Sequence, residues 1–171
     1  MDQKEIREKV LNCRSKQDAL LLSSFIVKNP VFIEELFVLM RNYKNKKYWL
    51  AAWVLDHVFE ESPELLLPYM DPMIELFQTT KSGSIQRIVG KLLSFNDITD
   101  KVDGSFVNIC FDMLTSQTIP VAVKVHAMQL VYNISTKFPE LKPELKLVIQ
   151  EQIPNNTVAF AARAKRLLKK L

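Results

Sequence analysis

Glycine is scarce in this chain, and its scarcity excludes two classes of structure. Only three glycines occur among 171 residues, whereas a β protein of this length would need more of them for its turns. Gly83, Gly90 and Gly104 also stand apart from one another, so no glycine-rich loop is present to cradle a phosphate. The sequence therefore predicts neither a β fold nor a phosphate-binding loop.

Cysteine and histidine are rarer still, with two residues each. Cys13 and Cys110 have no paired spacing, which predicts two reduced, buried thiols rather than a metal site or a disulfide framework. His57 and His126 stand in no HExxH or zinc-knuckle pattern, and we expect His57 on a helix surface beside Asp56. No Gly-x-Ser-x-Gly elbow occurs either. We therefore expect no metal, no cofactor and no catalytic residue, and thus a protein that is not an enzyme.

Long apolar runs and a strong charge of one sign are also missing. No run approaches the roughly 20 residues that a membrane helix needs, and Met1–Glu5 is charged from the start, unlike a signal peptide. We expect a cytoplasmic protein with no membrane partner. The net charge of +4 and the pI near 9.0 favour anionic partners but are too small to indicate nucleic acid alone.

A core signature recurs along the chain at an almost constant interval. It consists of a small or β-branched residue, two variable positions and two aliphatic residues. Its copies are Ala51…Val54-Leu55, Val89…Leu92-Leu93, Ala127…Leu130-Val131 and Ala164…Leu167-Leu168, at intervals of 38, 38 and 37 residues. A weaker copy, Asp18…Leu21-Leu22, lies 33 residues before the first. A period near 38 predicts stacked helical repeats that bury their apolar faces against their neighbours.

Capping residues and prolines divide the chain into helices. Ser15 is a typical N-cap, and Asn29-Pro30, Ser62-Pro63 and Phe138-Pro139 each end one helix and begin the next. The predicted helices are 2–13, 15–28, 30–41, 45–61, 63–79, 82–95, 103–115, 119–137, 139–152 and 155–170. They predict one all-α domain over residues 1–171, with repeats at about 15–41, 45–79, 82–115 and 119–152 and a terminal helix at 155–171.

The helix predicted at 45–61 shows which face is left for binding. With Ala51 at zero and about 100° per residue, Val54, Leu55 and Val58 fall on the packed side. The opposite strip, about 60° wide, holds Trp49, Trp53, Asp56 and Glu60. In a stack of such helices this strip becomes the lining of a groove.

The residues from Pro120 to Val131 resemble the second helix of a HEAT repeat, with a proline, then Val-Lys, a small alanine and aliphatic residues. Pro63–Tyr69 and Pro139–Pro143 are similar to the proline-broken first helices of such repeats. The resemblance covers about residues 15–171 and implies an α-α superhelix of about four and a half helical hairpins, whose second helices line a concave face. Most members of this family are scaffolds or protein-binding surfaces, and few are enzymes.

The repeat interval carries groove positions from one unit to the next. Trp49 corresponds to Arg87, Val125 and Ala162. Trp53 corresponds to Lys91, Gln129 and Arg166, and Asp56 to Ser94, Tyr132 and Lys169. The predicted groove is therefore lined by Trp49, Trp53, Asp56, Arg87, Lys91, Gln129, Tyr132, Arg166 and Lys169. Its last helix is expected to be basic, with no acidic residue and with Arg163, Lys165, Arg166, Lys169 and Lys170. Such a lining predicts a non-catalytic interaction module that binds a protein or peptide segment, acidic in character.

Three alternatives stay open. The charges are also explained by an ordinary solvated surface, on which basic residues favour helix C-termini. DNA binding is the second alternative, because the layout resembles alkylpurine DNA glycosylases built from HEAT-like repeats, with Trp53, Asp56 and Arg87 as candidate cleft residues. The third alternative is self-association through the open ends of the stack.

Overall fold

The computed structural model describes residues 1–42 and 46–171. The described residues form ten α-helices and six short 3-10 helices, with no strand. The α-helices are α1 (Gln3–Leu11), α2 (Lys16–Lys28), α3 (Ile33–Arg41), α4 (Trp49–Glu61), α5 (Met70–Thr79), α6 (Gly83–Ser94), α7 (Gly104–Thr115), α8 (Val121–Ser135), α9 (Lys142–Gln152) and α10 (Val158–Leu168). The all-α prediction is confirmed, and the predicted start at residue 45 lies outside the described residues. None of the described helices has the length and apolar character needed to span a bilayer.

Three predicted helices that start at a proline begin as 3-10 turns rather than as α-helix. These turns are η1 (Pro30–Phe32), η3 (Pro63–Tyr69) and η5 (Pro139–Leu141), and they precede α3, α5 and α9. Proline has no N–H to donate, so it fits a first turn but interrupts α-helical hydrogen bonding further along. Because η3 contains a second proline, Pro68, its α-helix begins only at Met70. Of the other 3-10 turns, η2 (Lys46–Tyr48) directly precedes α4, and η4 (Thr99–Lys101) and η6 (Ile153–Asn155) lie in the connections before α7 and α10.

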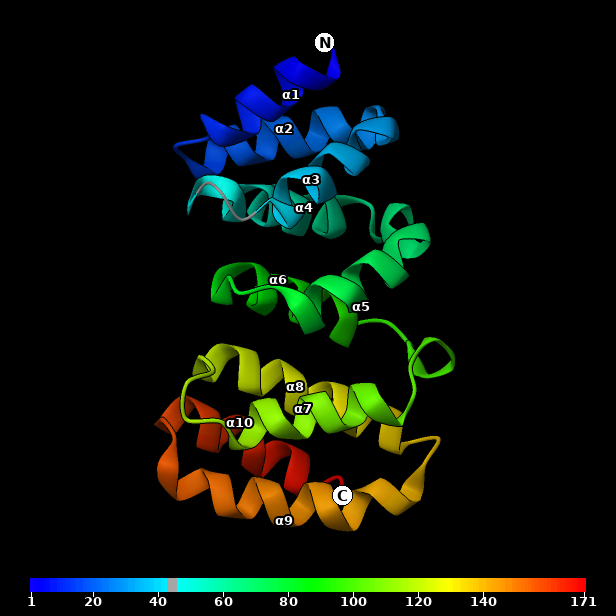
Figure 1. Cartoon of the computed structure of the whole chain (residues 1–171), viewed down its shortest axis with the longest axis vertical. Helices are drawn as coiled ribbons and strands as arrows, with labels where there is room; N and C mark the ends of the chain where they lie inside the picture. Colours follow the sequence, from blue (N-terminus) through cyan, green and yellow to red (C-terminus); the bar gives the residue numbers. More distant parts are fainter. Residues whose placement is uncertain (43–45) are drawn as a thin grey trace. The chain divides into compact units, whose positions relative to one another are not determined.

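The chain divides into two compact units, Met1–Leu92 and Leu93–Leu171. In the first unit α2 and α3 both pack against α4, and α1 contacts α3 and α4. In the second unit α8 packs against α7, α9 and α10 (Figure 1). α4 and α8 are therefore the most surrounded helices of their units. The predicted single domain and its repeat boundaries stay a prediction.

The recurring signature forms the core of the units, with one error of register. Ala51, Val89, Ala127 and Ala164 are fully buried, as are the aliphatic pairs that follow the first three. The weak first copy is wrong by one residue, because Leu21 is 66% exposed whereas Ala19 is fully buried and Leu22 nearly so. Asp18 instead accepts a hydrogen bond from the Ser15 N–H at 3.0 Å, completing the capping box of α2. The small residue on the packed face is therefore Ala19, one position later.

Helix α1 is attached to α3 by a charged contact as well as by apolar packing. Ile6 and Val10 are fully buried, and the Arg7 guanidinium pairs with Glu35 of α3. Glu35 is almost fully buried whereas Arg7 is partly exposed, so the pair lies at the edge of the core. The contact explains how the first helix covers the end of its unit.

Candidate functional site

The nine predicted groove residues fall into separate groups. Within the first unit Trp49 and Trp53 form an aromatic pair, and Asp56 and Lys91 form an ion pair. Within the second unit Gln129, Arg166 and Lys169 line one pocket. Arg87 is exposed on α6 and forms no ion pair with a described residue, while Tyr132 is half-buried on α8 and does not line that pocket.

The aromatic pair lies at the start of α4. The Trp49 and Trp53 rings stack with centroids 6.0 Å apart, and Trp49 is 38% exposed while Trp53 is half-buried. Trp49 also borders a cavity of about 380 Å³, whose other lining residues are Met40, Asn42, Lys46, Tyr48, Lys81, Ser82 and Ile85. An exposed indole beside two lysines suits a ligand that is partly apolar and negatively charged.

The ion pair changes the predicted charge of the first unit. The Lys91 ammonium lies 2.7 and 3.0 Å from the two carboxylate oxygens of Asp56 and 3.6 Å from Glu60. Lys91 was expected as a groove cation, but these carboxylates neutralise it, because Asp56 and Glu60 lie one turn apart on α4 and face α6. This part of the surface is therefore not basic.

His57 belongs to the same cluster and is not the surface residue expected. It is 7% exposed, and its ring lies 6.0 Å from that of Trp53. Its Nδ1 is 2.9 Å from Glu60, and this contact, together with Lys91, lowers the pKa of the Glu60 carboxyl. The Nε2 atom is buried and has no hydrogen-bond partner among the described residues. The cluster links α4 to α6 and has a structural role in the first unit.

The second unit carries the most basic cavity found beside the predicted residues. This basic pocket has a volume of about 420 Å³ and is lined by Gln129, Arg163, Arg166, Leu167, Lys169 and Lys170. The segment from Val158 to Leu171 contains five basic residues and no acidic one. In the described part of the chain, no carboxylate pairs with any of the four cations of the pocket. The positive charge of the basic pocket is thus uncompensated.

Two linked hydrogen bonds organise the basic pocket, and the sequence analysis did not predict them. Arg163 Nη2 donates to Gln129 Oε1 at 2.8 Å, and Gln129 Nε2 donates to Asn133 Oδ1 at 2.8 Å. Asn133 was absent from the predicted groove, whereas Arg163 and Lys170 were expected on its basic last helix. The spacing of Gln129 and Asn133, four residues apart on one helix, was the available signal.

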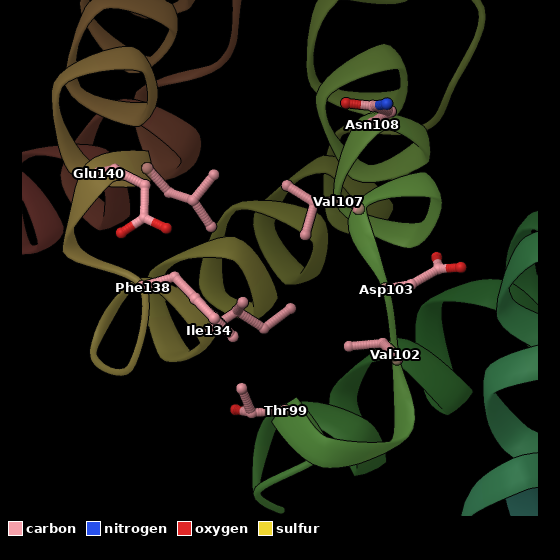
Figure 2. Close-up of a pocket in the computed structure, with 10 residues that line it drawn as sticks. Thr99, Val102, Asp103, Val107, Asn108, Ile134, Phe138 and Glu140 are labelled. Carbon is pink, nitrogen blue, oxygen red and sulfur yellow. The ribbon is translucent and has the colours of Figure 1, made fainter.

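An apolar pocket that no pattern predicted lies elsewhere in the second unit (Figure 2). Its volume is about 290 Å³, and it is lined by Thr99, Val102, Asp103, Gly104, Val107, Asn108, Ile134, Phe138, Glu140 and Leu141. Figure 2 shows the Asp103 side chain turned away from Ile134 and Phe138, and this carboxylate accepts hydrogen bonds from the Ser105 and Phe106 N–H groups at the start of α7. The Ser105 hydroxyl also donates to this carboxylate, and this bond, together with the two backbone bonds, lowers the pKa of Asp103. The lining comes from four separate elements, which explains why no local pattern reveals it.

The groups that would support metal or thiol chemistry are not gathered in the described structure. Among residues 1–42 and 46–171, no group of three or more His, Cys, Asp or Glu side chains is placed to hold a metal ion. Both cysteines are free and buried, and burial raises the pKa of each thiol. The two thiols therefore resemble core residues.

Comparison with known proteins identifies the family. The family profile described as HEAT repeat domain matches residues 6–171, nearly the whole chain. No curated protein and no solved structure matches the chain. The match agrees with the helical order described above and with the resemblance seen in the sequence, so the predicted helical-repeat fold is confirmed. The chain belongs to the HEAT repeat family.

Proposed function

We propose that this protein is a non-catalytic interaction module that binds an acidic segment of a partner protein, with the basic pocket between α8 and α10 as its main contact. The observation that carries the proposal is the uncompensated charge of this pocket. Arg163, Arg166, Lys169 and Lys170 surround one cavity without a pairing carboxylate in the described chain. Acidic side chains in a partner would supply the missing counter-charges.

The aromatic surface of the first unit supports the same class of ligand. Trp49 is exposed beside Lys46 and Lys81, and neither lysine forms an ion pair with a described residue. Tryptophan and cationic residues are enriched at the energetic centres of protein interfaces. Each unit thus offers a surface suited to an acidic, partly apolar segment.

An ordinary helix end is the competing explanation for the charge of α10. Lys165 and Arg166 lie in its last turn, where a cation gains about 0.3–1 kcal/mol from the helix dipole. That gain applies to Lys165 as much as to Arg166, although only Arg166 lines the pocket. Substitutions at Lys165 and at Arg166 therefore distinguish a stabilising role of the positive charge from a role in binding.

The test compares the binding of one acidic probe by two charge-reversal variants. A fluorescein-labelled peptide rich in glutamate is titrated with the full chain, with Arg166→Glu and with Lys165→Glu, and fluorescence anisotropy is measured. We expect Arg166→Glu to weaken binding by about tenfold or more, since it replaces an attraction by a repulsion, and Lys165→Glu to weaken it much less. Equal affinities of the two variants, at equal thermal stability, would refute the role of the pocket.

The DNA alternative receives no support of its own from the arrangement. Asp56, its candidate carboxylate, is paired with Lys91, and none of the three cavities described above is lined by Trp53, Asp56 or Arg87. A duplex oligonucleotide is the comparison ligand in the same titration. Binding of DNA that is tighter than that of the peptide and falls steeply with added salt would favour the alternative.

A further inference from the structure

We infer that the basic pocket recognises a phosphorylated side chain within the partner segment, and that the Arg163 guanidinium binds the phosphate. This inference rests on the proposed function and names the group that the pocket prefers. It starts from the way in which Arg163 is held.

A chain of three hydrogen bonds fixes the Arg163 guanidinium relative to the backbone. Asn133 Nδ2 donates to the Ser94 carbonyl oxygen at 2.9 Å, Gln129 Nε2 donates to Asn133 Oδ1 at 2.8 Å, and Arg163 Nη2 donates to Gln129 Oε1 at 2.8 Å. All four residues belong to the second unit. A guanidinium held in this way loses less freedom when it binds a ligand, and its other N–H groups remain to donate.

These three hydrogen bonds orient the Arg163 guanidinium without neutralising its charge. Gln129 and Asn133 are neutral amides, so the full positive charge of Arg163 remains in the pocket. Lys91 in the first unit shows the contrasting case, because the carboxylates of Asp56 and Glu60 hold it and also cancel its charge. An arginine held by an amide is therefore prepared for an external anion.

The number of cations favours a phosphate over a single carboxylate. A carboxylate offers one negative charge, whereas a phosphorylated side chain carries about 1.5 to 2 negative charges at neutral pH and three acceptor oxygens. The pocket presents two arginines and two lysines around one cavity, and the arginine fork matches two phosphate oxygens at once. Leu167, the apolar residue of the lining, is 3% exposed.

The compact arrangement favours a single phosphate group in a peptide over a nucleic-acid strand. The four cations lie within Arg163–Lys170, the end of α10 and the two residues that follow it, a span of about 11 Å at the helical rise per residue. Proteins that bind single strands without sequence preference instead combine a basic groove along the backbone with aromatic stacking platforms. None of the residues that line this pocket is aromatic.

The experiment uses three fluorescein-labelled peptides of identical sequence except at one central position, which is serine, glutamate or phosphoserine. Affinity for the full chain is measured by fluorescence anisotropy. We expect the phosphoserine peptide to bind about tenfold more tightly than the glutamate peptide, and the serine peptide to bind most weakly.

Two variants test the role of Arg163 in this preference. Arg163→Lys keeps the positive charge but removes the forked guanidinium, and Gln129→Leu removes the hydrogen bond that holds Arg163 without a change of charge. Both variants should reduce the preference for phosphoserine over glutamate to about twofold or less, while Lys165→Ala, the control outside the pocket, should leave it unchanged.

The outcomes separate this inference from the proposed function. Equal affinity for the phosphoserine and glutamate peptides would overturn the inference and leave acidic-segment binding intact. Failure of both peptides to bind would overturn the two together. A single-stranded oligonucleotide that displaces the phosphoserine peptide at comparable concentration would identify nucleic acid as the source of the phosphate and would also overturn the inference. A phosphoserine preference that survives in both Arg163→Lys and Gln129→Leu would remove Arg163 from the role assigned to it.

Discussion

Replacing Lys91 by methionine should destabilise the protein and leave acidic-peptide binding unchanged. The Lys91 ammonium contacts both carboxylate oxygens of Asp56, at 2.7 and 3.0 Å. The two side chains are 30% and 16% exposed, so the pair lies between a surface salt bridge, worth at most about 1 kcal/mol, and a buried one, whose rupture costs about 3–5 kcal/mol. We therefore expect Lys91→Met to lower the free energy of unfolding by about 1.5 kcal/mol, since Asp56 would lose its partner in a half-buried position.

Urea denaturation and thermal unfolding measure this loss directly. A change of about 1.5 kcal/mol corresponds to a fall in Tm of about 3–6 °C for a chain of this size. Arg87→Met is the matched control, because Arg87 lies one turn earlier on α6, is exposed, and has no ion pair with a described residue. The control should change stability by no more than about 0.5 kcal/mol. Equal stabilities of Lys91→Met and Arg87→Met, or a loss of peptide affinity in Lys91→Met, would refute the structural role of Lys91.

Two further predictions concern the thiols and the acid end of the pH range. Cys13 and Cys110 are buried and burial raises the pKa of both thiols, so Ellman's reagent should modify neither in the folded protein; rapid reaction of either one in the absence of denaturant would contradict their placement. Bonds from Thr99 and Lys137 lower the pKa of Asp97 from 3.8 to about 2, so the stability that they confer is present above about pH 4 and is lost as the pH falls towards 2. Asp97→Asn should therefore be less stable than the wild type above pH 4, and the difference should shrink towards pH 2; a difference in urea midpoint that stays constant across this range would disprove the assignment.

The helical fold was predictable because its signals are local or periodic. Ser15 and the prolines that begin η1, η3 and η5 mark helix boundaries within a few neighbouring residues. Ala51, Val89, Ala127 and Ala164 recur at the interval of the repeat and are all buried. The predicted register of the core signature is wrong at Asp18, because this side chain forms a capping hydrogen bond instead of packing in the core. A periodic pattern alone does not distinguish a capping residue from a core residue.

The candidate site was only partly predictable, because charge pairing depends on contacts between helices. Gln129, Arg166 and Lys169 were placed on one surface by the repeat interval, and they line one pocket. The same interval treated Lys91 as equivalent to Arg166, yet Lys91 meets Asp56 and Glu60 while Arg166 meets no described acid. The difference lies in neighbouring helices: α4 presents two carboxylates to α6, and α8 presents an amide to α10. Which of these side chains contact each other depends on how the helices pack, and the repeat interval alone does not predict those contacts.

The most direct test of the basic pocket is a map of the residues that an acidic peptide contacts. Chemical-shift changes in a labelled sample of the full chain, titrated with the phosphoserine peptide, report each affected backbone and side-chain amide. We predict that the largest changes fall on Gln129, Arg163, Arg166, Lys169 and Lys170, with Asn133 following Gln129 through their hydrogen bond. Saturating changes that are centred on other residues, with these positions unaffected, would contradict the account.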